Sequence, residues 1–220
     1  MPRRGYSAAD RAELAELLAP RERLMPFARR VVPQVFPMFD WDERAYLVPL
    51  MDKLEACEHG RVRLIANLPP RFGKSVCTMT TLVWLMTLWP GLRHALVGYG
   101  QEFIESQAKV MLRLAAAAGV RLEQHAAGEW TVAGGGRLYV SSIDGPMVGR
   151  GVDGVFVLDD CHKHMRDALS PARQEAVWSY FVSVTQTRLE GDASIVIPMT
   201  RWCQGDLTDR ILATEKKRAA

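Results

Sequence analysis

The stretch VRLIANLPPRFGKSVCTMTTLVW, residues 62–84, decides the fold of this chain. An apolar run leads into two prolines and Gly-Lys-Ser, and a second apolar run follows. The strict phosphate-loop pattern requires a glycine, any four residues and then Gly-Lys-Ser or Gly-Lys-Thr, but Leu68 stands here at the first glycine position. A loop that binds phosphate must leave a buried strand and enter a helix, because the helix N-terminus supplies aligned N–H groups and a positive dipole. Residues 62–88 follow that order, so we interpret 68–75 as a phosphate loop rather than as a chance Gly-Lys-Ser.

The chemistry of such a loop assigns a role to its residues. The two prolines have no N–H to donate, so the phosphate cradle must come from the amides of residues 71–75. Gly73 permits a close approach, Lys74 reaches the outer phosphates, and Ser75 can ligate Mg²⁺. The expected nucleotide-binding residues are Pro70, Arg71, Phe72, Gly73, Lys74, Ser75 and Val76.

A second motif, VFVLDD at residues 155–160, ends in two carboxylates. A phosphate loop needs an acidic partner for its metal ion at the end of another buried strand. We therefore expect Asp159 to face Mg²⁺ and Asp160 to act as general base for the attacking water. The alternative is that this acidic pair caps the next helix.

Apolar runs that could be strands alternate with helical segments along most of the chain. We expect strands at 62–67, 94–99, 155–160 and 193–199, a hairpin or two short strands at 129–133 and 137–142, and helices at 7–19, 21–31, 42–57, 75–88, 101–117, 171–186 and 206–214. Pro33 and Pro37 predict an extended linker, and Pro49 could kink the helix around it. Strands that are apolar throughout and alternate with helices indicate a mainly parallel sheet with helices on both faces. The expected fold is therefore α/β with three layers.

The order of the two motifs separates classes of phosphate-loop protein. Small-molecule kinases usually place the two nucleotide-binding strands side by side, without an intervening strand. Here at least one strand–helix unit, 94–117, lies between Lys74 and Asp159. This insertion, with an acid directly after the metal carboxylate, indicates a motor-type ATPase, the group of helicases, translocases and packaging motors.

A third strand end, IVIPMTRWCQGDLTDRIL at residues 195–212, adds two polar residues to the expected site. Thr200 and Arg201 leave the strand beside the predicted nucleotide, where a polar residue can sense the γ-phosphate. The alternative is that Arg201 only pairs with Asp206 or Asp209.

Composition limits the class of protein further. The 220 residues suit one domain with a small appendage, and 48% hydrophobic with 24% charged residues is ordinary for a globular chain. The net charge of +3 is weak evidence for a polyanionic partner; 22 arginines against 6 lysines suit phosphate contacts, but an arginine-rich genome would give the same bias. Four scattered cysteines show no disulfide framework, which favours a reducing cytoplasm. No targeting peptide is evident, and the most apolar stretch, 76–89, is too short to span a bilayer, so we expect a soluble protein with no membrane partner.

Together these motifs resemble the ATPase domain of phage terminase large subunits, the motors that package viral DNA. LPPRFGKS (68–75) is similar to that family's Pro-Pro-Arg-x-Gly-Lys-Ser variant of the phosphate loop. GPMVGRGVDGVFVLDDCHK (145–163) is similar to its Gly-Arg-Gly approach to an acidic motif, and PMTRWCQGDLTDRIL (198–212) to its coupling segment. A looser match, VGYGQEFIESQAKVMLR (97–113), lies between the first two of these three segments. The chain departs from the family at Cys161, Met199 and Cys203, which usually are proline, glutamine and histidine, but keeps the nucleotide ligands.

The resemblance implies a phosphate-loop NTPase core of the additional-strand type at residues 61–220 and a small N-terminal helical lid at residues 1–60. It implies hydrolysis of ATP, with Mg²⁺, to drive double-stranded viral DNA into a procapsid. The implied partners are DNA, the portal protein, the small terminase subunit and other copies of this chain in a ring of five, with a monomer expected in isolation. The implied location is the cytoplasm of the infected bacterial host and, transiently, the capsid portal. The spaced carboxylates of a two-metal nuclease are missing, so we expect no nuclease domain and no nuclease activity in this chain.

Rings of this kind typically complete each site with an arginine from the neighbouring subunit. Arg113 is the first candidate by its place in the looser match, and Arg150, between two glycines, is the second. Arg71 could instead act from within its own phosphate loop, and each of the three could equally be a surface salt-bridge residue. The expected catalytic residues are Lys74, Arg71, Asp160, Arg113, Thr200 and Arg201, and the expected metal ligands are Ser75 and Asp159.

Some features and functions stay as alternatives. Phe39 and Trp41 could stack on adenine, but core packing is the favoured role. The Cys161, His162, His164 and Cys203 side chains have a spacing that fits no standard zinc site, so we expect no zinc there. A helicase-like DNA translocase would require further nucleic-acid motifs and a second motor domain, and a non-hydrolysing assembly module would only bind nucleotide.

Overall fold

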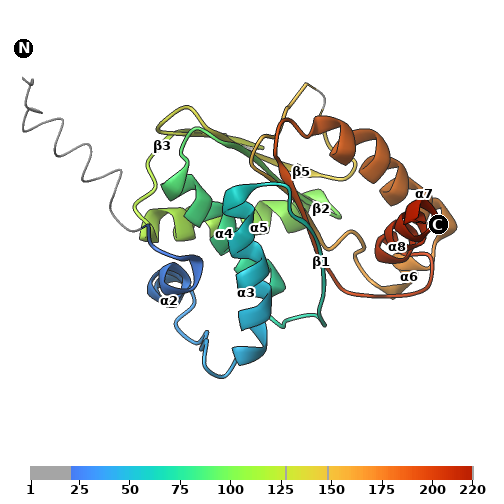
Figure 1. The fold of residues 1–220 in the computed structure, drawn as a ribbon, viewed down its shortest axis with the longest axis horizontal. Coiled ribbons are helices and arrows are strands. Elements are labelled where there is room, and N and C mark those ends of the chain that lie inside the picture. The colour runs from blue at the N-terminus through green and yellow to red at the C-terminus, as the bar shows by residue number, and fades with distance from the viewer. Residues whose placement is uncertain (1–20, 127, 148, 220) are drawn as a thin grey trace, which may run out of the picture.

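The computed structural model describes residues 21–126, 128–147 and 149–219, which are built around a mixed β-sheet (Figure 1). In this part of the chain the sheet has seven strands in the order β1-β7-β6-β2-β5-β4-β3. The strands are β1 Arg63–Asn67, β2 Arg93–Gly98, β3 Leu122–Ala126, β4 Glu129–Val132, β5 Arg137–Ser142, β6 Val155–Asp159 and β7 Ser194–Met199. The first five strands in the sheet order run parallel, and β4 and β3 are antiparallel to their neighbours.

Helices cover both faces of the sheet (Figure 1). One side carries α2 Leu24–Val35, α3 Val48–Glu55, α4 Lys74–Leu88 and α5 Gln101–Ala117, and the other carries α6 Met165–Ala168, α7 Pro171–Tyr180 and α8 Leu207–Ala219. A π-helical turn, Phe181–Thr185, continues α7. Because α4 is buried around most of its circumference, its apolar run is a core helix. Among the described residues, no helix is both long enough and apolar enough to cross a membrane.

The central strands are apolar throughout because each of their faces packs on a helix layer. All five residues of β6 are buried. Val155 and Val157 belong to the core with α2 to α5, whereas Phe156 and Leu158 belong to the core with α7 and α8. Side chains alternate between the faces of a strand, so a strand covered on both sides must be apolar at every position. The three-layer α/β fold expected from the sequence is therefore confirmed.

The position of β7 determines which loops meet. β7 lies between β1, which leads into the phosphate loop, and β6, which ends in the acidic pair. The three strands are parallel, so their carboxyl ends lie at one edge of the sheet. The strand between β1 and β6 is therefore β7 and not β2, the strand of the 94–117 unit, which lies on the other side of β6. This order assembles the loops after β1, β6 and β7 at one place.

Two of the expectations built on proline were wrong. α2 continues through Pro33 to Val35, where we expected an extended linker. Val31 and Val32 are fully buried in this helix, and their packing offsets the hydrogen bond that proline removes. Pro49 does not kink its helix but lies in the first turn of α3, where a missing N–H needs no partner.

Other differences concern short or exposed elements. β3 and α6 were not predicted, and α8 continues beyond residue 214 to Ala219. The helix expected at 7–19 lies outside the described residues. The division of the chain at residue 60 stays a prediction; the described helices before it, α2 and α3, pack into the same core as α4 and α5.

Candidate active site

The loop between β1 and α4 has the backbone geometry of an anion cradle. Arg71 and Gly73 both have positive φ angles, 66° and 90°. A Cβ at position 73 would lie 3.0 Å from Leu47 Cδ1 and 3.2 Å from Phe39 Cζ, so this position needs glycine for its φ angle and for space. α4 begins at Lys74 without a side-chain cap among the described residues, which leaves its first amides available to a phosphate.

Lys74 connects the three strand ends at the centre of the site. Its side chain is only 4% exposed. The Lys74 Nζ lies 2.9 Å from Asp160 Oδ2 and donates to Thr200 Oγ1 at 3.2 Å. The backbone N–H of Thr200 in turn donates to Asp160 Oδ1 at 3.0 Å. The structure thus brings together three residues that the sequence analysis selected on three separate segments.

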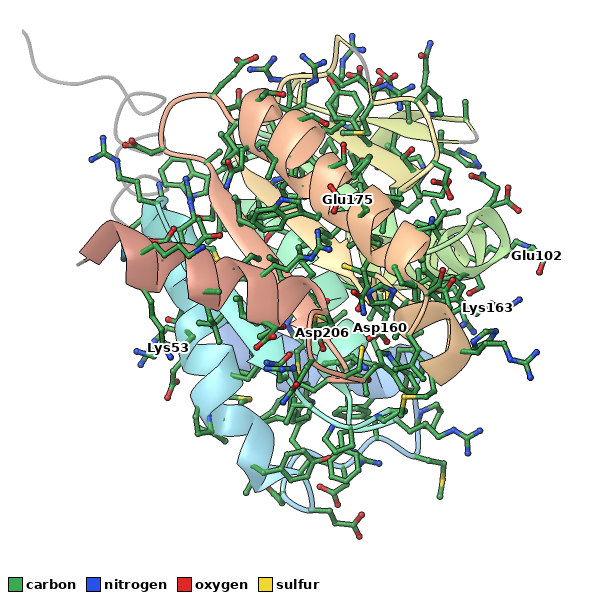
Figure 2. All side chains as sticks on the ribbon, turned by 90° about the vertical axis from the view of Figure 1, so that its right-hand side faces the viewer. Lys53, Glu102, Asp160, Lys163, Glu175 and Asp206 are labelled. Carbon is green, nitrogen blue, oxygen red and sulfur yellow. The ribbon has the colours of Figure 1, made fainter. Side chains whose placement is uncertain are left out.

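Asp160 directly follows β6 and has a strained backbone. Its φ is 41°, in the left-handed region that non-glycine residues rarely adopt. Its backbone N–H donates to Pro198 O at 3.0 Å, so both its main chain and its side chain are held by the end of β7. Strain of this kind persists only where the surroundings enforce it, and it clusters at functional sites. Figure 2 labels Asp160 at this end of the domain, between α6 and α8.

Asp159 is the candidate metal ligand and is fully buried. Neither of its carboxylate oxygens has a hydrogen-bond partner among the described residues. Burial and the neighbouring Asp160 carboxylate raise the pKa of Asp159 to about 7, against the smaller opposing influence of Ser75 and Lys74. A buried carboxylate without a partner, next to a serine hydroxyl at the phosphate loop, fits the hard oxygen ligands that Mg²⁺ prefers. Asp159 and Ser75 therefore form a donor pair that suits Mg²⁺.

Arg201 has the partners that the sequence analysis left open as its alternative role. Its Nε lies 3.1 Å from Asp206 Oδ2, and its Nη2 lies 3.7 Å from Asp209 Oδ1. Asp206 is fully buried and also accepts from the N–H groups of Trp202 and Asp209. It thereby joins the segment after β7 to the first turn of α8.

The three arginine candidates differ in their exposure and in their partners. Arg71 and Arg113 are exposed, and neither forms a salt bridge within the described residues. Arg150 is partly buried, donates to Pro146 O and lies 3.6 Å from a Glu129 oxygen. Arg113 is in the C-terminal half of α5, whereas Arg71 is in the phosphate loop itself.

The cysteine and histidine residues near Asp160 are buried or take part in local hydrogen bonds. Cys161 and His162 are buried, His164 caps α6 by accepting from Asp167 N at 3.1 Å, and Cys203 Sγ lies 3.3 Å from Ala168 O. Within the described ranges, no group of three histidine, cysteine or acidic residues could hold a metal ion. The geometry gives no support to a zinc site.

Phe39, one of the two aromatic residues considered from the sequence, lies beside Gly73 of the phosphate loop, where an added Cβ would be 3.2 Å from Phe39 Cζ. Trp41 is buried and packs edge-on against Phe39, with ring centroids 4.9 Å apart. The exposed pair is Tyr46 and Phe72, whose ring centroids lie 5.5 Å apart; the Tyr46 hydroxyl donates to Phe72 O. Phe72 is one of the residues expected from the sequence to bind the nucleotide, and Tyr46, which the sequence did not single out, contacts it here.

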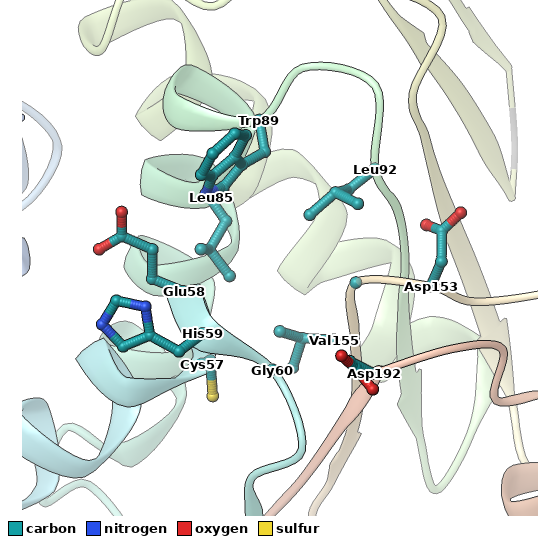
Figure 3. A pocket seen from close by; sticks show the side chains of 11 residues that line it. Cys57, Glu58, His59, Gly60, Leu85, Trp89, Leu92, Asp153, Val155 and Asp192 are labelled. Atoms are coloured by element: carbon teal, nitrogen blue, oxygen red, sulfur yellow. The ribbon is translucent and has the colours of Figure 1, made fainter. Parts of the chain in front are cut away.

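Two cavities lie away from this site. A cavity of about 230 Å³ opens near the start of β6 and is lined by Cys57, Leu85, Trp89, Asp153 and Asp192 (Figure 3). Its acidic groups already have basic partners, such as Arg93 for Asp153 and Arg61 for Asp192. A larger cavity of about 770 Å³, mostly apolar, lies between the edge strand β1, the end of α7 and α8. Neither contains the residues of the phosphate loop.

Comparison with solved structures shows which known proteins share this fold. No family model matches the chain, and no curated protein matches it. The large terminase of bacteriophage HK97 is similar over 90% of this chain and 41% of its own, with a TM-score of 0.56 and 12% sequence identity. The large terminase of a thermophilic bacteriophage is similar over 67% of this chain and 38% of its own, with a TM-score of 0.50 and 14% identity. The chain thus has the fold of part of these phage large terminases, as its motifs led us to expect, and spans about two fifths of their length.

Proposed function

We propose that this chain binds ATP with Mg²⁺ and hydrolyses it to drive double-stranded viral DNA into a procapsid. The observation that carries the proposal is the convergence of Lys74, Asp160 and Thr200 from three strand ends at a loop built for phosphate. The fold that the chain shares with phage large terminases supports the packaging role. DNA, the portal protein, the small terminase subunit and a ring of this chain are the partners we propose, with the host cytoplasm and the capsid portal as the location.

The contacts of Lys74 support an order of events in the site. In the structure its ammonium group pairs with Asp160. The oxygens of a nucleotide γ-phosphate compete for this ammonium group, since charge-assisted bonds to phosphate are strong. Once Lys74 turns to the phosphate, the freed Oδ2 of Asp160 can accept the proton of the attacking water. The other oxygen, Oδ1, stays bonded to the Thr200 amide and transmits the change to the segment after β7.

Asp159 and Ser75 would hold Mg²⁺, which would neutralise charge on the phosphate oxygens. The roles of the remaining residues follow from their positions. Thr200 contacts both Lys74 and, through its amide, Asp160, so it is the residue we assign to coupling. Arg201 acts through the Asp206 pair that joins it to α8.

Steady-state ATP turnover per subunit, measured over a range of protein concentrations, tests this proposal. We expect turnover that rises with concentration, because an arginine from a neighbour completes the site, and that is lost in Lys74→Ala and in Asp160→Asn. Binding of ATP without turnover above these variants at any concentration would contradict it and favour a non-hydrolysing assembly module. Turnover that does not depend on protein concentration but rises with single-stranded DNA would favour a helicase-like translocase.

A further inference from the structure

Arg173, in the first half of α7, contacts three segments that are far apart in the sequence. Its Nη2 donates to Tyr99 O at 2.9 Å, and its Nη1 lies 3.0 Å from Asp144 Oδ2. Its Nε lies 3.8 Å from Asp167 Oδ2. The side chain is 17% exposed, so these contacts are only partly screened by water.

The three contacted segments surround the loop that carries the proposed catalytic base. Tyr99 follows Gly98, which pairs with Asp159 in the sheet. Asp167 accepts from the Lys163 backbone N–H at 3.1 Å and so fixes the chain three residues after Asp160. The third contact holds the loop after β5, which leads toward β6 from the other side. Figure 2 shows Asp160 and Lys163 in this region, beside the helix α6 that follows them.

The backbone of Asp160 gives such an attachment a role. A positive φ of 41° at a residue with a side chain persists where the surrounding structure enforces it. Contacts from β7 hold Asp160 itself, burial holds Cys161 and His162 after it, and the Asp167 bond fixes Lys163 next in the chain. The planar guanidinium of Arg173 can bind a carbonyl and two carboxylates at once, which a lysine ammonium does less well.

We propose that Arg173 is a positioning residue that holds Asp160 in place for hydrolysis by tying together the ends of β2, β5 and β6. This inference rests on the proposed function, because it concerns the orientation of its general base. Arg173 does not contact the phosphate loop, so it acts on the rate of the reaction and not on nucleotide binding.

The chain offers a matched control at the opposite end of the parallel strands, where they begin. Arg93, at the start of β2, lies 2.7 Å from Asp153 Oδ2 and 2.6 Å from Glu190 Oε2. It therefore joins the segments that lead into β6 and β7, as Arg173 joins the segments that leave β2, β5 and β6. Loss of Arg93 removes two ion pairs that are shorter than those of Arg173, but only the contacts of Arg173 surround Asp160.

The experiment compares Arg173→Ala, Arg173→Lys and Arg93→Ala with the unchanged protein in kcat, KM and nucleotide affinity. We expect Arg173→Ala to lower kcat about 10- to 100-fold with KM and affinity changed less than about twofold, as for a reacting group displaced by about 1 Å. We expect Arg173→Lys to recover only part of kcat and Arg93→Ala to keep it within about twofold. Equal kcat losses in the two alanine variants, or full activity in Arg173→Lys, would overturn the proposal.

Hydrogen exchange separates a failure of this inference from a failure of the proposed function. If the unchanged protein does not hydrolyse ATP, the proposed function fails, but the attachment can still be measured. We expect the amides of residues 160–164 to exchange faster in Arg173→Ala and to be unchanged in Arg93→Ala. Unchanged exchange of these amides in Arg173→Ala would overturn the positioning role, whatever the activity.

Discussion

At the scale of single residues, Gly73 combines two requirements that can be measured separately. Its φ of 90° disfavours any side chain, and an added Cβ would press on Leu47 and Phe39. Gly135, in the turn between β4 and β5, has nearly the same φ of 89° but open space around it. We expect Gly135→Ala to lower the free energy of unfolding by about 1–2 kcal/mol through backbone strain alone. Gly73→Ala should cost more and should also weaken nucleotide binding at least tenfold.

Chemical denaturation and titration with a fluorescent ATP analogue measure both effects. Gly135→Ala reports backbone strain alone, because Gly135 lies away from the phosphate loop. Gly73→Ala reports both strain and the loss of the phosphate cradle. Equal affinities in the two variants would contradict the cradle that we assign to residues 71–75.

The burial of His94 leads us to expect that the stability of the fold depends on pH. Burial lowers the pKa of His94 to about 4, and its Nδ1 accepts from the Val155 backbone N–H. The folded state therefore binds fewer protons than the unfolded state, whose histidine has a pKa near 6.5. The stabilisation is complete above pH 6.5 and is lost as the pH falls from 6.5 toward 4. Between pH 6.5 and 5 we expect a loss of about 2 kcal/mol.

The difference between the unchanged protein and His94→Asn, measured by denaturation at several pH values, isolates this contribution. Asparagine keeps an acceptor for Val155 but does not titrate, so the two stability curves should converge as the pH falls. Parallel curves would contradict the assigned pKa shift.

The residues of the active site could be predicted where they follow apolar strands. Asp159, Asp160 and Thr200 stand at the end of such a strand or directly after it, Lys74 opens the helix after β1, and the carboxyl ends of parallel strands meet. Arg173 could not be predicted in the same way. Its partners lie in loops 29 and 74 residues away and in the short helix α6, 6 residues away, where no periodic pattern indicates which segments meet.

At the scale of elements, the buried carboxylate of Asp206 should decide the stability of α8. It accepts from the Asp209 N–H at 3.1 Å, as an N-cap does, and also pairs with Arg201. We expect Asp206→Ala to lower the free energy of unfolding by about 2 kcal/mol, because the cap alone contributes about 1 kcal/mol. Asp206→Asn keeps a good cap without the charge and should cost less than half as much. Denaturation curves that place the asparagine variant level with the alanine variant would show that the ion pair dominates.

Helices and strands could be predicted from the sequence where the pattern of their own apolar residues is clear. β6 and β7 are apolar at nearly every position, and α5 has the bounds that its pattern predicted. β3, with the sequence LEQHA, is mostly exposed and exists because β4 pairs with it, so its own pattern carries little signal. α2 continues past Pro33 because of packing that only the tertiary structure supplies.

At the scale of the whole molecule, the position of Arg113 implies that it cannot serve its own site. α5 begins at Gln101, just after β2 ends at the edge of the active site. Arg113 lies twelve residues further along this helix, about 18 Å away at about 1.5 Å per residue. An exposed arginine at that distance, with no salt bridge among the described residues, is available to a neighbouring subunit in the ring that we propose.

Mixing two inactive variants tests this arrangement. Lys74→Ala subunits keep Arg113 but lack a working phosphate loop, and Arg113→Ala subunits keep the loop but lack the arginine. In a ring that mixes equal amounts at random, about a quarter of the interfaces join an intact loop to an intact arginine, so we expect turnover of about a quarter of that of the unchanged protein. Each variant alone should be lower by about 10³-fold or more. If the mixture stays as inactive as its components, Arg113 does not act between subunits, and the same pairing with Arg150→Ala then decides whether the second candidate does.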